Sequence, residues 1–199
     1  MTEPSVAGVL LAAGSSERFG DENKLLATLD GDPLVCHAAR TLAESGVDAV
    51  AAVVAADAPD VRTALSGLDL AIHEAPDADE GRAGSIRHGV ARARSHDAVC
   101  FALGDMPRVA PETVDRLVAA YREGRGSALA AGHEGQRGNP VLFDRRHFDA
   151  LAALEGAAGG RSVFRAAADA AVVETGDPGV RIDVDTPADL AALREQASE

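Results

Sequence analysis

A loop of small residues that carries two cations follows the first apolar run of the chain. Residues 11–26 read Leu-Ala-Ala-Gly-Ser-Ser-Glu-Arg-Phe-Gly-Asp-Glu-Asn-Lys-Leu-Leu. Small side chains leave backbone N–H groups accessible to a base or to phosphates, and Arg18 and Lys24 can neutralise phosphate charge. The spacing fits neither a P-loop nor the glycine-rich dinucleotide fingerprint. The segment therefore predicts a polyphosphate-binding loop of another kind.

Lys24 is the only lysine of the chain, beside 18 arginines. A compact ammonium on a flexible stem can follow a reacting phosphate in a way that a planar guanidinium cannot. An ordinary connection between a strand and a helix would explain the loop if its glycine stood alone. The solitary lysine favours a catalytic role for Lys24.

Carboxylates lie at the ends of two other predicted strands. Asp105 lies in Leu-Gly-Asp-Met-Pro after the apolar run 98–103, and Asp183 and Asp185 lie in Asp-Val-Asp-Thr-Pro. A carboxylate at the tip of a strand can hold Mg²⁺ on a nucleotide, and residues two apart share one face of a strand. The alternatives are an ordinary turn at Asp105, and a helix N-cap at Asp185 or at the threonine that follows it.

A third segment contains Gly84 and Ser85 at the predicted start of a helix. Free backbone amides there, together with the serine hydroxyl, can contact a ribose or a base, and Arg82 or Arg87 can meet a phosphate. The segment is expected on the same edge of the sheet as the loop.

A fourth segment places Arg137 and Asn139 beside a glycine at the entry to a strand. An arginine and an amide at such a point can bind a second substrate. The alternative is a plain hairpin turn.

The elements that must position these residues alternate between strand and helix. Continuous apolar runs at 6–12, 47–55, 68–73 and 98–103 are typical of parallel strands covered on both faces. Amphipathic stretches at 33–45, 58–65 and 84–94 lie between them. This is the pattern of a Rossmann-like α/β fold, an open and mostly parallel sheet with helices on both faces, where ligands bind beyond the carboxyl ends of the strands.

The second half of the chain is less regular and predicts mixed pairing in the sheet. Helices are expected at 111–122, 145–154, 162–168 and from Pro187 onwards. Strands are expected at 127–131, 140–143, 171–174 and 181–184, with a turn over 132–138. With 199 residues and no linker, the sequence predicts one domain over 1–199.

Composition and charge indicate which partners and which environment the protein can have. A net charge of -13 would repel the phosphates of nucleic acids, so we expect no nucleic-acid partner. A single lysine among 19 cations, 19 aspartates against 13 glutamates and a high alanine content suit high salt and predict a halophilic source. The apolar runs are too short to cross a membrane, and no signal peptide is evident, so a cytoplasmic protein is expected. Cys36 and Cys100 are expected to be buried thiols, without a disulfide or zinc.

Taken in order, these motifs resemble the MobA-like nucleotidyltransferase family, and within it the molybdenum cofactor cytidylyltransferases. The resemblance covers nearly the whole chain. Besides the loop, it includes Gly-x-x-x-Ser-Ile-x-x-Gly at 81–89, Gly-Asp-Met-Pro at 104–107, Arg-Gly-Asn-Pro-Val-Leu-Phe at 137–143 and Asp-Val-Asp-Thr-Pro-Ala-Asp-Leu at 183–190. Ala13 resembles the cytidylyl type, because guanylyl-transferring relatives usually have glycine there. Gly159-Gly160-Arg161 departs from the family, where an aspartate often precedes a glycine and an arginine.

The resemblance implies a single domain of the nucleotide-diphospho-sugar transferase type. Such an enzyme would transfer CMP from CTP to the phosphate of molybdopterin with Mg²⁺ and release pyrophosphate. It implies catalytic roles for Lys24, Arg18 and Asp105, metal binding by Asp105, Asp183 and Asp185, and acceptor contacts from Arg137, Asn139 and Arg161. The implied nucleotide contacts are Leu11, Ala12, Ala13, Gly14, Ser15, Arg18, Lys24, Gly84 and Ser85.

Other functions share the same motifs. The nearest alternatives are a guanylyltransferase for the same cofactor and a nucleotidyltransferase for a phospho-sugar, phospho-alcohol or phospholactate. A non-catalytic nucleotide sensor or a delivery partner of a molybdoenzyme belongs to a different class, and a cytidylyltransferase could itself contact a molybdoenzyme or its chaperone transiently. The retention of Arg18, Lys24 and Asp105 argues against the sensor, which has no need of groups for a reacting phosphorus.

Overall fold

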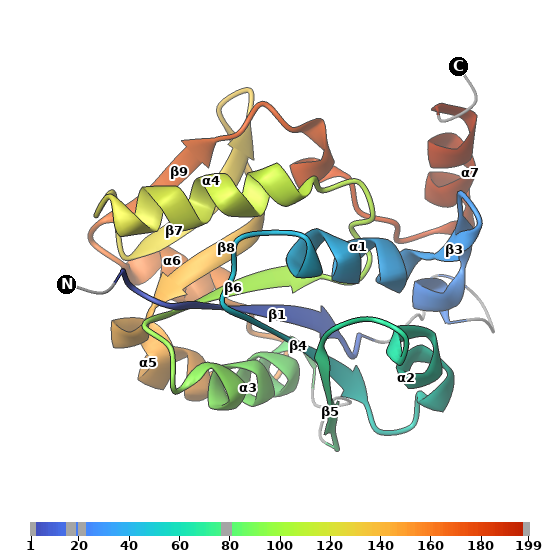
Figure 1. The fold of residues 1–199 in the computed structure, drawn as a ribbon, viewed down its shortest axis with the longest axis horizontal. Coiled ribbons are helices and arrows are strands. Elements are labelled where there is room, and N and C mark those ends of the chain that lie inside the picture. The colour runs from blue at the N-terminus through green and yellow to red at the C-terminus, as the bar shows by residue number, and fades with distance from the viewer. Residues whose placement is uncertain (1–2, 15–18, 20–22, 77–80, 197–199) are drawn as a thin grey trace.

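A seven-stranded mixed sheet forms the centre of the computed structural model (Figure 1), which describes residues 3–14, 19, 23–76 and 81–196. The strand order is β5-β4-β1-β6-β8-β7-β9. β1, β4, β5 and β6 run parallel, β8 is antiparallel to both β6 and β7, and β9 is parallel to β7. The strands are β1 Val6–Ala12, β4 Ala49–Ala55, β5 Ala71–Ala75, β6 Ala98–Leu103, β7 Ala128–His133, β8 Gln136–Asp144 and β9 Ala170–Glu174.

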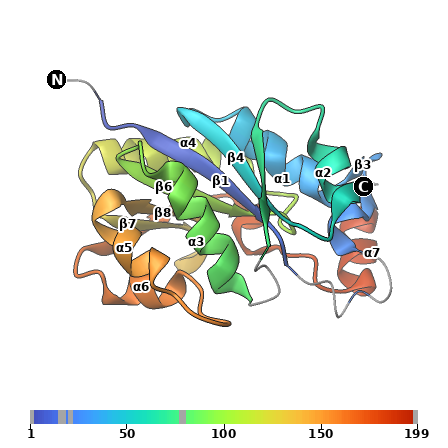
Figure 2. The same ribbon diagram turned by 90° about the horizontal axis from the view of Figure 1, so that it is seen from below.

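Helices cover both faces of this sheet, as the sequence predicts. One layer contains α1, α2 and α4, and the opposite layer contains α3, α5 and α6 (Figure 2). The helices are α1 Leu34–Ala43, α2 Pro59–Leu65, α3 Arg82–Ala93, α4 Pro111–Arg122, α5 Phe148–Ala152, α6 Arg161–Ala166 and α7 Pro187–Gln196. Smaller elements are the 3-10 helices η1 Lys24–Leu26, η3 Arg145–His147 and η4 Pro178–Arg181, and the short strands β2 Thr28–Leu29 and β3 Asp32–Pro33.

Alternate residues of the central strands supply the two cores. In β6, Cys100 packs in the core beneath α1 and α4, whereas Phe101 packs in the core beneath α3 and α5. Gly89 lets α3 approach this second core, because a Cβ there would lie 2.8 Å from both Phe101 and Val9. Both strand faces are therefore buried, which explains the continuous apolar runs.

Several predicted boundaries are confirmed and others are wrong. β1, β6 and α4 have the predicted ends, and α7 begins at Pro187 as expected. The predicted strand at 181–184 is absent: η4 occupies residues 178–181, and residues 182–185 have irregular backbone. The predicted turn over 132–138 is confined to Glu134 and Gly135, both at positive φ, because β7 and β8 continue into the turn from either side.

Smaller corrections concern lengths. β5 lies at 71–75 rather than 68–73, and the predicted helix at 145–154 is a 3-10 turn followed by the five-residue α5.

Cys36 and Cys100 are buried and free, as expected. No helix in the described part of the chain is both long and apolar enough to cross a membrane.

Candidate active site

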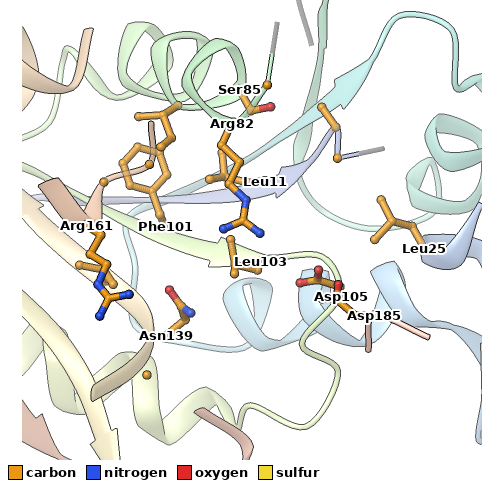
Figure 3. A pocket seen from close by; sticks show the side chains of 18 of the residues that line it. Leu11, Leu25, Arg82, Ser85, Phe101, Leu103, Asp105, Asn139, Arg161 and Asp185 are labelled. Atoms are coloured by element: carbon orange, nitrogen blue, oxygen red, sulfur yellow. The ribbon is translucent and has the colours of Figure 1, made fainter. Parts of the chain in front are cut away.

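A cavity of about 760 Å³ opens at the carboxyl ends of β1 and β6 (Figure 3). The loop after β1, the start of α3, the end of β6, strand β8 and the segments before α6 and α7 contribute to its walls. Its lining residues are Leu11, Ala13, Gly14, Lys24, Leu25, Gly81, Arg82, Ser85, Ile86, Phe101, Leu103, Asp105, Arg137, Gly138, Asn139, Val141, Phe143, Gly159, Gly160, Arg161 and Asp185. The position beyond the strand tips is the predicted one.

Lys24 joins two of the predicted carboxylates at one end of the cavity. Its Nζ lies 2.7 Å from Oδ2 of Asp105 and 2.8 Å from Oδ1 of Asp185. The lysine is only 7% exposed, and the carboxylates are partly buried. Residues that are 81 and 161 positions apart from Lys24 therefore converge on one ammonium group.

The surroundings keep Lys24 charged. Burial is the largest influence on its pKa and lowers it, but the hydrogen bonds and charges of Asp105 and Asp185 together outweigh burial. The pKa of Lys24 is therefore raised above its usual value, and the ammonium persists at neutral pH. Two carboxylates and one ammonium leave this end of the cavity with a formal charge of −1.

Local backbone structure fixes Lys24 and Asp105. The side chain of Asn23 caps η1 by accepting a hydrogen bond from the backbone N–H of Leu25, and Leu25 is buried. Gly104 lets the turn after β6 pack against this helix, because a Cβ there would lie 3.2 Å from the Leu25 side chain. The turn and the short helix thus hold the ammonium and the carboxylate against each other.

Asp185 is positioned by the start of α7. Asp189 accepts hydrogen bonds from the backbone N–H groups of Asp185 and Thr186, and its own N–H donates to the Thr186 hydroxyl. This reciprocal arrangement is a capping box. The predicted N-cap therefore exists at Thr186, and it leaves the Asp185 carboxylate at the cavity.

Asp183 does not join this cluster. It is exposed and absent from the cavity lining, since residues 182–185 are not the predicted strand. The backbone N–H of the intervening Val184 instead donates to the carbonyl of Asp105. The backbone contact ties the segment to the turn after β6, and the structure brings only Asp185 of the pair to Lys24.

The carboxylates suit a divalent cation held jointly with a ligand. Oδ1 of Asp105 is buried and has no hydrogen-bond partner among the described residues. No group of three or more His, Cys, Asp or Glu side chains within the described ranges could hold a metal by itself. Hard cations such as Mg²⁺ prefer one or two carboxylates completed by substrate phosphates, so Asp105 and Asp185 fit that arrangement.

The predicted nucleotide contacts other than Lys24, which lines the cavity, divide into three groups. Leu11, Ala13 and Gly14 line the cavity after β1, and Ser85, which is 6% exposed, lines it from α3. Ala12 and Gly84 are buried but are not lining residues. Ser15 and Arg18 lie outside the described residues.

The far end of the cavity is cationic. Figure 3 shows Asp105 and Asp185 at one side, Arg161 and Asn139 at the other, and Arg82 reaching from α3 into the space between. Arg137, the remaining predicted acceptor contact, also lines the cavity. The structure thus brings all three predicted acceptor residues to one wall.

The apolar floor and the approach of α3 were not anticipated from the sequence. Leu103, Val141 and Phe143 line the cavity from β6 and β8, and their alternation along the strands is a signal that could have revealed them. Gly81, at φ +96°, brings the start of α3 against the loop before α6, where a Cβ would lie 2.8 Å from the carbonyl of Gly156. That contact between distant segments has no signal in the sequence.

Several known proteins are similar to this chain in sequence. Purine catabolism protein PucB of Bacillus subtilis is 28% identical over 100% of both chains. Nicotine blue oxidoreductase of Paenarthrobacter nicotinovorans is 34% identical over 81% of this chain and 82% of its own length. Molybdenum cofactor guanylyltransferase of Burkholderia vietnamiensis is 34% identical over 64% of this chain and 62% of its own.

Solved structures and the model of a protein family also match this chain. Rv0371c from Mycobacterium tuberculosis superposes with a TM-score of 0.79 at 29% identity, covering 96% of this chain and 98% of its own. Its complex with manganese gives a TM-score of 0.77 at 28% identity, with the same coverage. The profile of the MobA-like NTP transferase domain matches residues 8–172. Because this match spans most of the chain, the protein belongs to the MobA-like NTP transferase family.

Proposed function

We propose that this nucleotidyltransferase transfers CMP from CTP to the phosphate of molybdopterin and releases pyrophosphate. The observation that carries the proposal is the meeting of Lys24, Asp105 and Asp185 at one end of a cavity large enough for two substrates. A reaction between two phosphate groups requires positive charge, because both the attacking and the leaving groups are anionic. Lys24 supplies one positive charge, and the two carboxylates can hold a divalent cation that supplies more.

The transfer is a single in-line displacement. An oxygen of the acceptor phosphate attacks the α-phosphorus, the bond from that phosphorus to the bridging oxygen of the β-phosphate breaks, and pyrophosphate departs with that electron pair. Lys24 stabilises the charge that grows on the α-phosphoryl oxygens, and Arg18 holds the β- and γ-phosphates. No residue of the chain forms a covalent intermediate.

Asp105 and Asp185 would hold Mg²⁺, with Asp183 outside the metal site. A divalent cation held by these carboxylates would supply charge neutralisation for the leaving pyrophosphate. The buried, unpartnered Oδ1 of Asp105 and the manganese complex of Rv0371c support such a site. Lys24 is drawn to the same carboxylates, and its flexible stem allows the ammonium to turn toward the nucleotide.

The choice of CTP rests on the small residues beside β1 and α3. Ala13 and Gly14 have small side chains or none, so they leave space in the cavity for a base. The buried Ser85 lines the same cavity. We infer that these three residues, with Leu11 and the backbone near Ala12, Ser15 and Gly84, frame a pyrimidine. Calorimetric titration with non-hydrolysable CTP and GTP analogues tests this: CTP should bind at least several-fold more tightly, and tighter GTP binding would overturn it.

A guanylyltransferase is the second candidate. It is favoured by the 34% identity to a protein named molybdenum cofactor guanylyltransferase. The same titration separates the two candidates, because the metal and lysine chemistry is common to both. The buried Lys24 disfavours a nucleotide sensor. A protein that only binds nucleotide does not need an ammonium group to stabilise charge on a reacting phosphorus.

The acceptor would bind at Arg137, Asn139 and Arg161, on the wall away from Lys24. We place the enzyme in the cytoplasm of a salt-adapted organism, acting on small molecules rather than nucleic acid, with transient contact to a molybdoenzyme or its chaperone. Pyrophosphate release in high salt, measured with each nucleotide and with or without molybdopterin, tests acceptor and nucleotide together. Release that depends on CTP and molybdopterin is expected.

A further inference from the structure

Lys24 engages the two carboxylates that would hold a divalent cation. Its ammonium lies 2.7 Å from Oδ2 of Asp105 and 2.8 Å from Oδ1 of Asp185, so it takes one oxygen from each side chain. A magnesium ion held by the same pair would lie about 2.1 Å from its oxygen ligands. An oxygen that accepts a hydrogen bond from an ammonium attracts a metal ion less strongly. The lysine and a divalent cation therefore compete for the same carboxylates.

Charge and burial make this competition strong. Two carboxylates and one ammonium carry a formal charge of −1, whereas the carboxylates alone carry −2. The ammonium also repels any second cation beside it, and water screens this repulsion little because Lys24 is buried. A divalent cation should therefore bind far more tightly once the ammonium has left the carboxylates.

The backbone of Lys24 is held in place, but its side chain has room to move. Asn23 caps η1 and Leu25 is buried, so the short helix itself is anchored. Four methylene groups let the ammonium turn into the cavity, which Lys24 lines together with Gly14. A Cβ at Gly14 would meet no atom of the described residues within 4 Å, so the space beside it is open. Phosphates bound there would offer the ammonium new acceptor oxygens and release the carboxylates to a cation.

We propose that Lys24 keeps divalent cations away from Asp105 and Asp185 until nucleotide phosphates draw the ammonium aside, so that the chain binds metal and nucleotide together. The inference rests on the proposed transferase function and adds the form in which the nucleotide is bound, as its complex with a divalent cation. It gives Lys24 a role before the chemical step as well as during it. The coupling is reciprocal, because the metal must favour the nucleotide as much as the nucleotide favours the metal.

The first measurement uses Mn²⁺ and the full chain without nucleotide. Mn²⁺ accepts the same oxygen ligands as Mg²⁺, and its free form can be quantified by electron paramagnetic resonance. Lys24→Gln and Lys24→Met remove the ammonium but keep an unbranched side chain. Each variant should bind Mn²⁺ at least about tenfold more tightly than wild type. Adding Asp105→Asn to Lys24→Gln should abolish this gain, because the gain depends on the carboxylate.

The second measurement uses the Mn²⁺ complexes of non-hydrolysable CTP and GTP analogues. Lys24→Gln should bind the preferred complex at least about threefold more weakly than wild type, because the ammonium no longer meets the phosphates. The substitution thus strengthens binding of the free ion and weakens binding of the complex. A lysine that only stabilised the structure of the site would leave both affinities weaker after its removal. Testing both nucleotides keeps the result independent of the choice between them.

Arg161→Gln is the matched control for charge. Arg161 is exposed and lies on the other side of the cavity from Asp105 and Asp185 (Figure 3). Its replacement removes one positive charge from the cavity without releasing the carboxylates, so the affinity for free Mn²⁺ should change less than about twofold. Thermal unfolding provides a second readout: Mn²⁺ should raise the Tm of Lys24→Gln more than that of wild type.

The proposal is refuted if both lysine variants bind free Mn²⁺ within about twofold of wild type or more weakly. A gain that survives Asp105→Asn, or that Arg161→Gln reproduces, would also refute it. The titrations of free Mn²⁺ involve no nucleotide, acceptor or turnover. Failure of the cytidylyl-transfer assay would therefore leave their result intact, and their failure would leave the transferase assignment standing.

Discussion

Replacing Lys24 by arginine tests whether the chain needs an ammonium group or only a positive charge. Nζ of Lys24 lies 2.7 Å and 2.8 Å from two separate carboxylates, in a residue that is 7% exposed. A guanidinium is planar and wider and carries its donors in a fixed fork. It cannot occupy the position of Nζ between Asp105 and Asp185 without moving these carboxylates or itself.

The magnitude follows from that displacement. A shift of about 1 Å in a catalytic group can cost on the order of a hundredfold in rate, or about 2.7 kcal/mol at 1.36 kcal/mol for each factor of ten. Charge is retained, so attraction to the triphosphate should survive. We therefore expect Lys24→Arg to lower kcat about a hundredfold with little change in the KM for the nucleotide.

The assay is steady-state pyrophosphate release over a range of nucleotide concentrations, with Mg²⁺ and acceptor saturating. Lys24→Gln is the comparison, because it also removes the charge and should raise KM as well as lower kcat. Thermal unfolding of both variants establishes that they fold. Turnover of Lys24→Arg above about half the wild-type rate would refute the reasoning, since the lysine would then act only as an electrostatic anchor.

Three further predictions concern single residues. Asp105→Asn should abolish measurable turnover while keeping the fold, as judged by circular dichroism; near wild-type rates would remove it from the metal site. Asp185→Asn should lower kcat at least about a hundredfold and Asp183→Asn less than about threefold, and the reverse order would contradict the geometry. Asp177→Ala removes two hydrogen bonds donated from the start of α4, by Ala110 and Thr113, and the hydrogen bond from the N–H of Gly179 by which Asp177 caps η4. This substitution should lower the free energy of unfolding by about 2 kcal/mol or more. An unchanged Tm would refute the prediction that these hydrogen bonds stabilise the fold.

The buried strands and the longest helices could be read from the sequence because burial on both faces leaves continuous apolar runs. β1, β6 and α4 accordingly have their predicted ends. The predicted strand at 181–184 is wrong: Val180, Ile182 and Val184 alternate like a strand, but β9 is the segment that pairs with β7 at this edge of the sheet. Alternation shows which residues are buried, whereas strand pairing depends on which segment lies beside the sheet, and here that segment is β9.

The candidate site was predictable to a similar degree. Asp105 and the loop with Lys24 follow parallel strands, and the rule that strand ends meet at one edge brings them together. The choice between Asp183 and Asp185 was not predictable, because it depends on irregular backbone and on the capping box at Thr186. The ring of Phe164 behind Arg137 also had no signal, since the two lie on separate elements far apart in the sequence.

The most direct test of the proposed function is pyrophosphate release by the purified protein in high salt with Mg²⁺, using CTP, GTP, ATP and UTP in turn. We predict rapid release only when CTP and molybdopterin are both present, and formation of a product that contains CMP joined to the acceptor phosphate. Faster release with GTP than with CTP, or release that does not depend on molybdopterin, would contradict the assignment.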